Sequence, residues 1–177
     1  VDVTAPDGSA DWSLCYNRNL IAKTADYIVF MAYDQNGISS TEPGTTAGYH
    51  WVETNINKFL KQEEVDSEKI ILGIPFYTRI WKTNEEGKST SEVVFMKDTY
   101  KKIPSDASIE WDDTLKQNYA EYKQNGATYR VWIEDIKSIR EKLLLINKYN
   151  LSGASFWAKD RETSETWDSV SEILNIK

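Results

Sequence analysis

Short runs of apolar residues recur along the chain, each long enough for one buried strand. The runs at 27–33 (Y-I-V-F-M-A-Y), 70–77 (I-I-L-G-I-P-F-Y) and 154–158 (A-S-F-W-A) are nearly continuous. A run of this kind is typical of a strand that is covered on both faces, as in a parallel sheet. Residues 1–4 (V-D-V-T) are rich in β-branched side chains and precede a Pro-Asp-Gly break, so we interpret them as the end of a further strand.

Between these runs, apolar residues recur at helical spacing. The pattern predicts a helix over 14–25 and another over 51–62, whose apolar side chains lie close to one face. Ser138 and Glu141 have the spacing of a capping box, which predicts a helix that begins there. A closing helix is expected over 163–174, with its cap at Thr163 or Ser164.

Residues 80–133 have a different character. Polar stretches such as T-N-E-E-G-K-S-T alternate with short β-like runs at 92–96, 108–111 and 128–133. This composition predicts a small inserted α+β lobe within the repeating strand and helix pattern.

The strand and helix alternation predicts an α/β fold with a parallel sheet. In such folds ligands bind beyond the carboxyl ends of the strands. Three of these ends combine aromatic and polar residues: Y-D at 33–34, F-Y-T-R at 76–79 and F-W-A-K-D at 156–160. A single such end is ordinary for a half-exposed strand terminus, whereas three together predict one shared site.

Composition narrows the range of ligand classes that the chain could bind. The seven Trp and ten Tyr fit either a large aromatic core or a groove that stacks against the apolar C–H faces of sugars. A net charge of −7 argues against a nucleic-acid partner and against an anionic membrane surface. With one histidine, His50, a His-based metal site is not expected, and no cofactor is predicted. No signal peptide is evident at the start, which resembles the middle of a longer fold.

Four motifs, taken in order, resemble those of the family 18 glycoside hydrolases, the chitinases and related N-acetylglucosaminidases. They are F-M-A-Y-D at 30–34, G-I-P-F-Y-T-R-I-W at 73–81, V-W-I-E-D-I-K-S-I-R-E-K at 131–142 and L-S-G-A-S-F-W-A-K-D at 151–160. The segment E-P-G-T-T-A-G-Y-H-W-V-E at 42–53 is most similar to the bacterial branch that acts on peptidoglycan and spore cortex. The resemblance implies a TIM barrel that carries an α+β insertion.

The same resemblance reveals an absence. The signature of the family, D-x-x-D-x-D-x-E, whose last residue is the general acid, does not occur in the sequence. A full barrel needs about 250 residues, so we expect the C-terminal half: strands five to seven over 1–79, the insertion over 80–133, and the last strand with its helices over 134–177. We expect this chain alone to be inactive as a hydrolase.

The resemblance also implies roles for the rim. These enzymes retain configuration because the acetamide of the substrate itself attacks the anomeric carbon, an exception to the usual two-carboxylate scheme. Tyr33 would position that acetamide, and Asp34 would accept hydrogen bonds from a sugar or tune its neighbours. Trp157 would form an apolar floor under the sugar, and Tyr77 and Arg79 would line the same groove.

Glu134 is a further substrate-binding candidate, since it enters from the insertion. A purely structural role is the alternative for several of these residues. Tyr33 and Trp157 could be core packing, and Arg79 could belong to a surface ion pair. Glu134 could serve the positive end of the helix that follows it.

Two functions follow from the resemblance. The first is a hydrolase that cleaves β-1,4 linkages of N-acetylglucosamine-containing glycans, either chitin or peptidoglycan. The second is a catalytically dead relative that binds such glycans as a lectin. The expected partners are the glycan and either a missing N-terminal half-barrel or a second copy of the chain, because an isolated half would expose open sheet edges. The parent protein is expected to be secreted and associated with the cell wall or spore.

Overall fold

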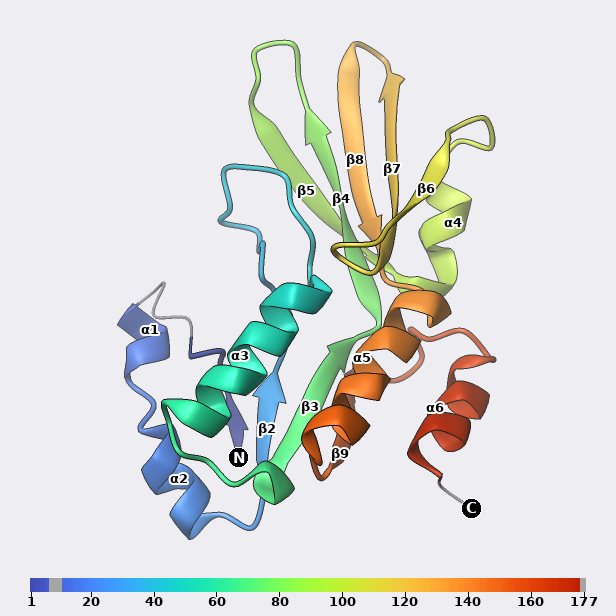
Figure 1. The fold of residues 1–177 in the computed structure, drawn as a ribbon. Helices are drawn as coiled ribbons and strands as arrows, with labels where there is room; N and C mark the ends of the chain where they lie inside the picture. The colour runs from blue at the N-terminus through green and yellow to red at the C-terminus, as the bar shows by residue number, and fades with distance from the viewer. Residues whose placement is uncertain (7–10, 176–177) are drawn as a thin grey trace.

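The structure, a computed structural model, describes residues 1–6 and 11–175. Two sheets organise it, and Figure 1 shows one above the other. The lower sheet is parallel, in the order β1-β2-β3-β9, and its strands are β1 Asp2–Val3, β2 Ile28–Met31, β3 Ile70–Pro75 and β9 Gly153–Trp157. The upper sheet is antiparallel, in the order β5-β4-β8-β7-β6, and its strands are β4 Tyr77–Thr83, β5 Ser89–Phe95, β6 Ile109–Asp112, β7 Gln117–Gln124 and β8 Ala127–Ile133.

Helices connect the parallel strands and cover one face of their sheet. They are α1 Asp11–Leu14, α2 Arg18–Thr24, α3 Tyr49–Lys61, α5 Ile136–Tyr149 and α6 Thr166–Leu174, while α4 Thr99–Lys102 belongs to the upper lobe. Short 3-10 helices cover Ser67–Lys69 and Met96–Asp98. Side chains from α2, α3, α5 and α6 form one core with the strands, in which Phe30 packs on the Phe59 ring at 4.9 Å between centroids.

Alternation along the strands separates the two faces of the parallel sheet. Phe30 and Ala32 lie in the helix-covered core, and so do Leu72, Ile74 and Phe76. Because successive side chains of a strand point to opposite faces, Met31, Tyr33, Gly73 and Pro75 belong to the other face. This face, here called the open face, carries no helix among the described residues. The parallel strands form an open sheet and do not close into a barrel.

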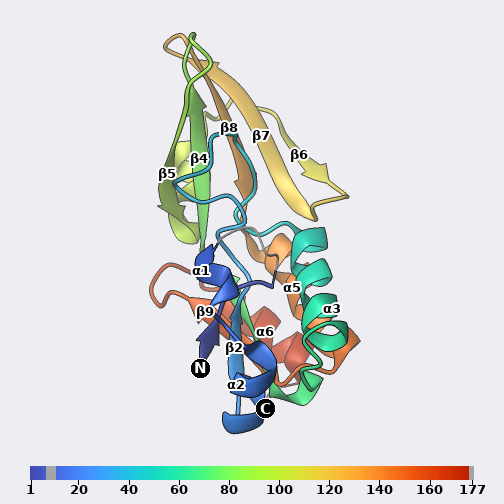
Figure 2. The same ribbon diagram turned by 90° about the vertical axis from the view of Figure 1, so that its left-hand side faces the viewer.

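The upper sheet grows directly out of the parallel sheet. The chain leaves β3 at Pro75, and Phe76 connects the two sheets, since its N–H donates to Trp157 O at 2.7 Å and its carbonyl accepts from Met96 N at 3.0 Å. Strand β4 then continues upward as a member of the antiparallel sheet (Figures 1 and 2). The side chains that follow Phe76 are therefore held at the carboxyl end of β3.

The loop at 35–48, which follows β2, makes hydrogen bonds with the antiparallel sheet. Trp81 Nε1 donates to Gly44 O at 2.8 Å, and Thr45 Oγ1 donates to Gln117 Oε1 at 2.5 Å. Trp81 is almost completely buried by these contacts. The antiparallel sheet is thus tied both to β3 and to the loop that follows β2.

Three helix predictions need correction. The helix expected over 14–25 is two short helices, because Asn17 caps α2 by accepting a hydrogen bond from Leu20 N at 3.0 Å. The cap of α5 is Asp135 rather than Ser138; Ser138 is the third residue of the helix and completes the capping box by accepting from Asp135 N. Helix α6 begins at Thr166 after Glu165, and neither Thr163 nor Ser164 caps it.

Within the described residues, no helix has the length and hydropathy needed to cross a bilayer.

Candidate active site

Tyr33 lies on the open face just beyond the end of β2. Its ring passes over Gly73 on β3, where an added Cβ would lie 3.3 Å from Tyr33 Cε1 and 2.6 Å from Phe30 O. Glycine at this position therefore avoids a clash with the Phe30 carbonyl and leaves room for the Tyr33 ring against the sheet. Burial, together with the nearby charges of Asp2 and Asp34, raises the pKa of Tyr33 to about 12. The phenol keeps its proton at neutral pH and can act as a hydrogen-bond donor.

Asp34 follows in a left-handed backbone conformation, with φ of 58°. Aspartate adopts this region more readily than most residues do. The turn directs its carboxylate toward the start of β4, where Tyr77 Oη donates to Asp34 Oδ1 at 2.9 Å. Burial and the Asp34 carboxylate raise the pKa of Tyr77, so Tyr77 is also a fixed donor.

Arg79 approaches the same carboxylate oxygen. Its Nη2 lies 3.6 Å from Asp34 Oδ1, and its Nη1 donates to Ser91 Oγ at 3.3 Å. The guanidinium is largely buried, whereas about half of the Asp34 side chain is exposed. The ion pair considered for Arg79 from the sequence is present, and its partner is another candidate site residue.

Tyr33 and Tyr77 complete this group. Their ring centroids are 6.2 Å apart and the rings are inclined at 68°, an edge-to-face arrangement. The structure thus brings Tyr33, Asp34, Tyr77 and Arg79 together at the carboxyl ends of β2 and β3, although 44 residues separate the two tyrosines in sequence.

Trp157 lies at the carboxyl end of the neighbouring strand. The register of β3 and β9 pairs Pro75 with Trp157. The preceding residue, Phe156, stacks on Phe76 at 4.7 Å on the helix-covered side. Trp157 therefore points to the open face, where its side chain is 55% exposed. It is not a core residue in this structure.

Glu134 is placed elsewhere, and the prediction that it binds substrate is corrected. Its side chain is completely buried at the start of α5. Lys142 Nζ donates to both carboxylate oxygens, at 3.2 and 3.0 Å, Ser138 Oγ donates at 3.0 Å and Gln117 Nε2 at 2.5 Å. Burial raises the pKa of Glu134, and Lys142 and Ser138 oppose that shift. A carboxylate enclosed in this way joins the upper sheet to α5 and does not face a ligand.

Two more open-face residues were missed in the sequence. Asp2 pairs with Val29 in the register of β1 and β2, and its charge acts on Tyr33. Ser155 pairs with Gly73, next to the Tyr33 ring. The sequence signal for both was the two-residue period of their strands. It places Asp2 on the other face of the sheet from the buried Val3, and Ser155 on the same face as Trp157.

Comparison with known proteins identifies the family of the chain. Residues 1–162 match the model of the glycosyl hydrolases family 18. The chain belongs to this family. The match confirms the predicted fold class, which is the C-terminal part of a TIM barrel with an α+β insertion. At the level of the family, it also supports the glycoside hydrolase class.

Relatives and a solved structure agree with the match. The chain is 28% identical over 169 residues to the uncharacterized glycosylase YvbX of Bacillus subtilis, covering 94% of the chain and 48% of that protein. It is 25% identical to the cortical fragment-lytic enzyme of the same organism, covering 93% and 38% respectively. A chitinase from Chromobacterium violaceum superposes with a TM-score of 0.85 at 27% identity, over the whole chain and 55% of that chitinase. The chain spans about half the length of the curated relatives it matches.

Proposed function

We propose that the chain supplies the substrate-positioning half of a retaining glycosidase that cleaves β-1,4 linkages in glycans containing N-acetylglucosamine. The observation that carries this proposal is the cluster of Tyr33, Asp34, Tyr77 and Arg79 at one end of the parallel sheet, with Trp157 on the same face. The Tyr33 phenol donor, a carboxylate held in place by Tyr77 and Arg79, and an exposed indole suit an N-acetylated sugar. The relatives named as a chitinase and as a cortical fragment-lytic enzyme make chitin and peptidoglycan the candidate polymers.

In the proposed reaction the acetamide oxygen of the bound sugar attacks the anomeric carbon while the bond to the leaving oxygen breaks. The Tyr33 phenol donates to the acetamide and holds its oxygen in line with the anomeric carbon. The acetamide of the substrate thus takes the place of a nucleophile on the protein. Asp34 contributes negative charge beside the cationic oxazolinium that forms, and Tyr77 and Arg79 hold that carboxylate in place. Water then attacks the anomeric carbon from the side that the leaving oxygen vacated, the bond to the acetamide oxygen breaks, and configuration is retained after two inversions.

The leaving oxygen needs a proton from a general acid. The run D-x-x-D-x-D-x-E that supplies it in the family is absent from this sequence. We therefore propose that the chain alone binds glycan but does not cleave it, and that cleavage needs the N-terminal strands of a complete barrel. The relationship to a cortical fragment-lytic enzyme favours a parent protein associated with the cell wall or spore.

Replacing Trp157 with alanine tests the sugar-stacking role. Because the indole is 55% exposed, the fold should remain intact while binding of an N-acetylglucosamine tetramer weakens by roughly 10- to 100-fold. Calorimetric titration of the chain measures this change. Trp111→Ala is the matched control, since Trp111 lies on β6, at the far edge of the antiparallel sheet from β4. Equal affinity in the Trp157 variant and the wild type would show that Trp157 does not contact the glycan.

A further inference from the structure

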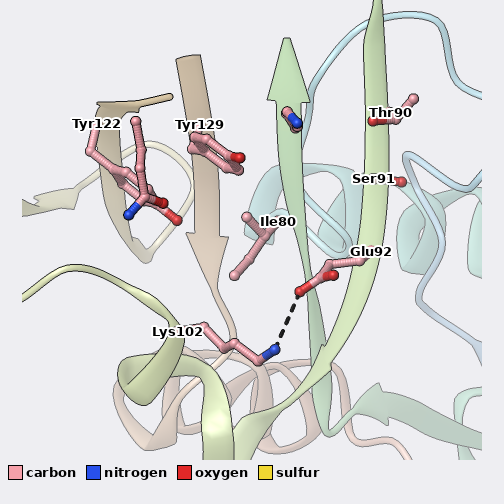
Figure 3. A pocket seen from close by; sticks show the side chains of 9 residues that line it. Ile80, Thr90, Ser91, Glu92, Lys102, Tyr122 and Tyr129 are labelled. Atoms are coloured by element: carbon pink, nitrogen blue, oxygen red, sulfur yellow. Dashed lines mark ion pairs between the residues drawn. The ribbon is translucent and has the colours of Figure 1, made fainter. Parts of the chain in front are cut away.

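A pocket of about 430 Å³ lies on the antiparallel sheet, across β4 from the candidate active site, and its lining includes Ser91, whose Oγ accepts from Arg79. Alternation along β4 separates the two: Arg79 and Trp81 face the site and the loop at 35–48, whereas Ile80 and Lys82 point to the opposite face. The pocket, here called the far-face pocket, is lined by Ile80, Lys82, Glu92, Lys102, Tyr122 and Tyr129 among others (Figure 3). Its volume lies within the range of about 300–1,000 Å³ that is usual for small-molecule sites.

Two tyrosines form an aromatic surface in this pocket. Tyr122 on β7 and Tyr129 on β8 are direct cross-strand partners. Their rings are parallel to within 1° with centroids 5.1 Å apart, and both are partly exposed. Figure 3 shows them side by side, with Ile80 next to Tyr129. The two rings stack on each other, so the stack presents its ring edges and outer ring face as an apolar surface at little entropic cost.

Polar groups surround this surface. Lys102 of α4 reaches toward Glu92 of β5, with 3.7 Å between Nζ and Oε1. Lys82 is exposed at the rim. Within the described residues, no hydrogen bond engages the hydroxyl groups of Tyr122 and Tyr129 or the Lys82 ammonium group. The pocket therefore combines apolar ring faces with unused donors and acceptors, and it holds two lysines against one glutamate in a chain of net charge −7.

We propose that the far-face pocket is a second glycan-binding site, which takes a sugar unit that carries a carboxylate. The outer surface of the tyrosine stack receives the apolar face of the sugar ring, and Lys82 and Lys102 receive its carboxylate and hydroxyl groups. This inference rests on the proposed function, because the glycan in question is the polymer on which the active site works. A second contact on the opposite face of the lobe raises the effective concentration of the polymer near the open face.

The test is a titration of the isotope-labelled chain, followed by NMR shifts of backbone amides. One ligand is a neutral N-acetylglucosamine tetramer, and the other is an N-acetylglucosamine–N-acetylmuramic acid disaccharide, which carries a carboxylate. We expect the disaccharide to shift amides around Tyr122 and Tyr129. Tyr129→Ala and Lys82→Glu should each weaken this binding by about tenfold.

Lys82→Glu is included because its exposed side chain makes no contribution to the core, so it keeps the test valid if Tyr129→Ala unfolds. Lys88→Glu, the same charge change at the β4–β5 hairpin, should leave binding unaltered. Trp157→Ala should weaken the response at the open face and leave that of the far-face pocket unchanged. No shift at Tyr122 and Tyr129 with either glycan, while the open face responds, overturns this inference alone. Shifts at the pocket with no response at the open face uphold the pocket and count against the proposed function.

Discussion

Replacing Lys142 with alanine is expected to lower the free energy of unfolding at neutral pH by about 3–5 kcal/mol, because it leaves a buried carboxylate without its counter-charge. Both members of the Lys142–Glu134 pair are almost completely enclosed, and the ammonium group contacts both carboxylate oxygens. Ser138 and Gln117 cannot replace the positive charge. Chemical denaturation of the chain and the variant, followed by circular dichroism, measures the loss.

The pH dependence of this loss has a defined sign. Burial already raises the pKa of Glu134, and removal of Lys142 removes the largest opposing interaction. An acid whose pKa is higher in the folded state than in the unfolded state is stabilising below its unfolded pKa, and that contribution is lost as the pH rises. The deficit of Lys142→Ala relative to wild type should therefore shrink as the pH falls through the range in which glutamate protonates.

Two control variants separate this effect from general damage. Glu134→Gln combined with Lys142→Met removes both charges and keeps an acceptor for Gln117, so it should be clearly more stable than Lys142→Ala. Lys148→Ala removes the exposed member of an ion pair whose Glu53 partner keeps a hydrogen bond from Tyr149, and it should have only a small effect. Equal losses in Lys142→Ala and Lys148→Ala would contradict the buried pair as a structural joint.

Replacing Tyr33 with phenylalanine is expected to lower kcat by about 10²–10³-fold in a complete barrel, the usual effect of removing one aligned donor to a reacting oxygen. Its ring packing on Tyr77 and Gly73 is kept, so the fold should be unaffected. Because the pKa of Tyr33 is about 12, the effect should be the same from pH 5 to about pH 10. The assay is hydrolysis of an N-acetylglucosamine oligomer by a barrel in which an N-terminal half that bears D-x-x-D-x-D-x-E is fused ahead of Val1.

Tyr27→Phe is the matched control for this variant. It removes the same hydroxyl group from a half-exposed tyrosine that precedes β2, at the opposite end of that strand from Tyr33. Its rate should equal that of the parent barrel. A Tyr33→Phe variant with undiminished kcat would show that the phenol does not position the acetamide.

Strands were predictable from the sequence where both of their faces are buried. The apolar runs around Phe30 and Leu72 form β2 and β3, because both faces of each run lack polar side chains. Strand β7 was not predicted. Its sequence, Q-N-Y-A-E-Y-K-Q, is mostly polar since one of its faces meets solvent, and its pairing with β8 decides the structure.

The candidate site was predictable as a set of strand ends but not as a hydrogen-bonded cluster. That the Tyr77 phenol and the Arg79 guanidinium meet one oxygen of Asp34 depends on the turn of Asp34 into a left-handed conformation. No local pattern encodes that contact. Glu134 was misassigned although a signal existed: Ser138 and Lys142 follow it at steps of four residues, the spacing that places side chains on one face of a helix.

The central claim, that this half-barrel positions the acetamide of the substrate for attack, is tested most directly by the anomeric configuration of the first-formed product. The measurement is a proton NMR time course of oligosaccharide cleavage by the fused barrel, with the 177-residue chain alone as the reference. We predict a β-anomer first from the fused barrel and no cleavage by the chain alone. Release of the α-anomer first, or a folded barrel that binds the oligosaccharide without cleaving it, would contradict the claim.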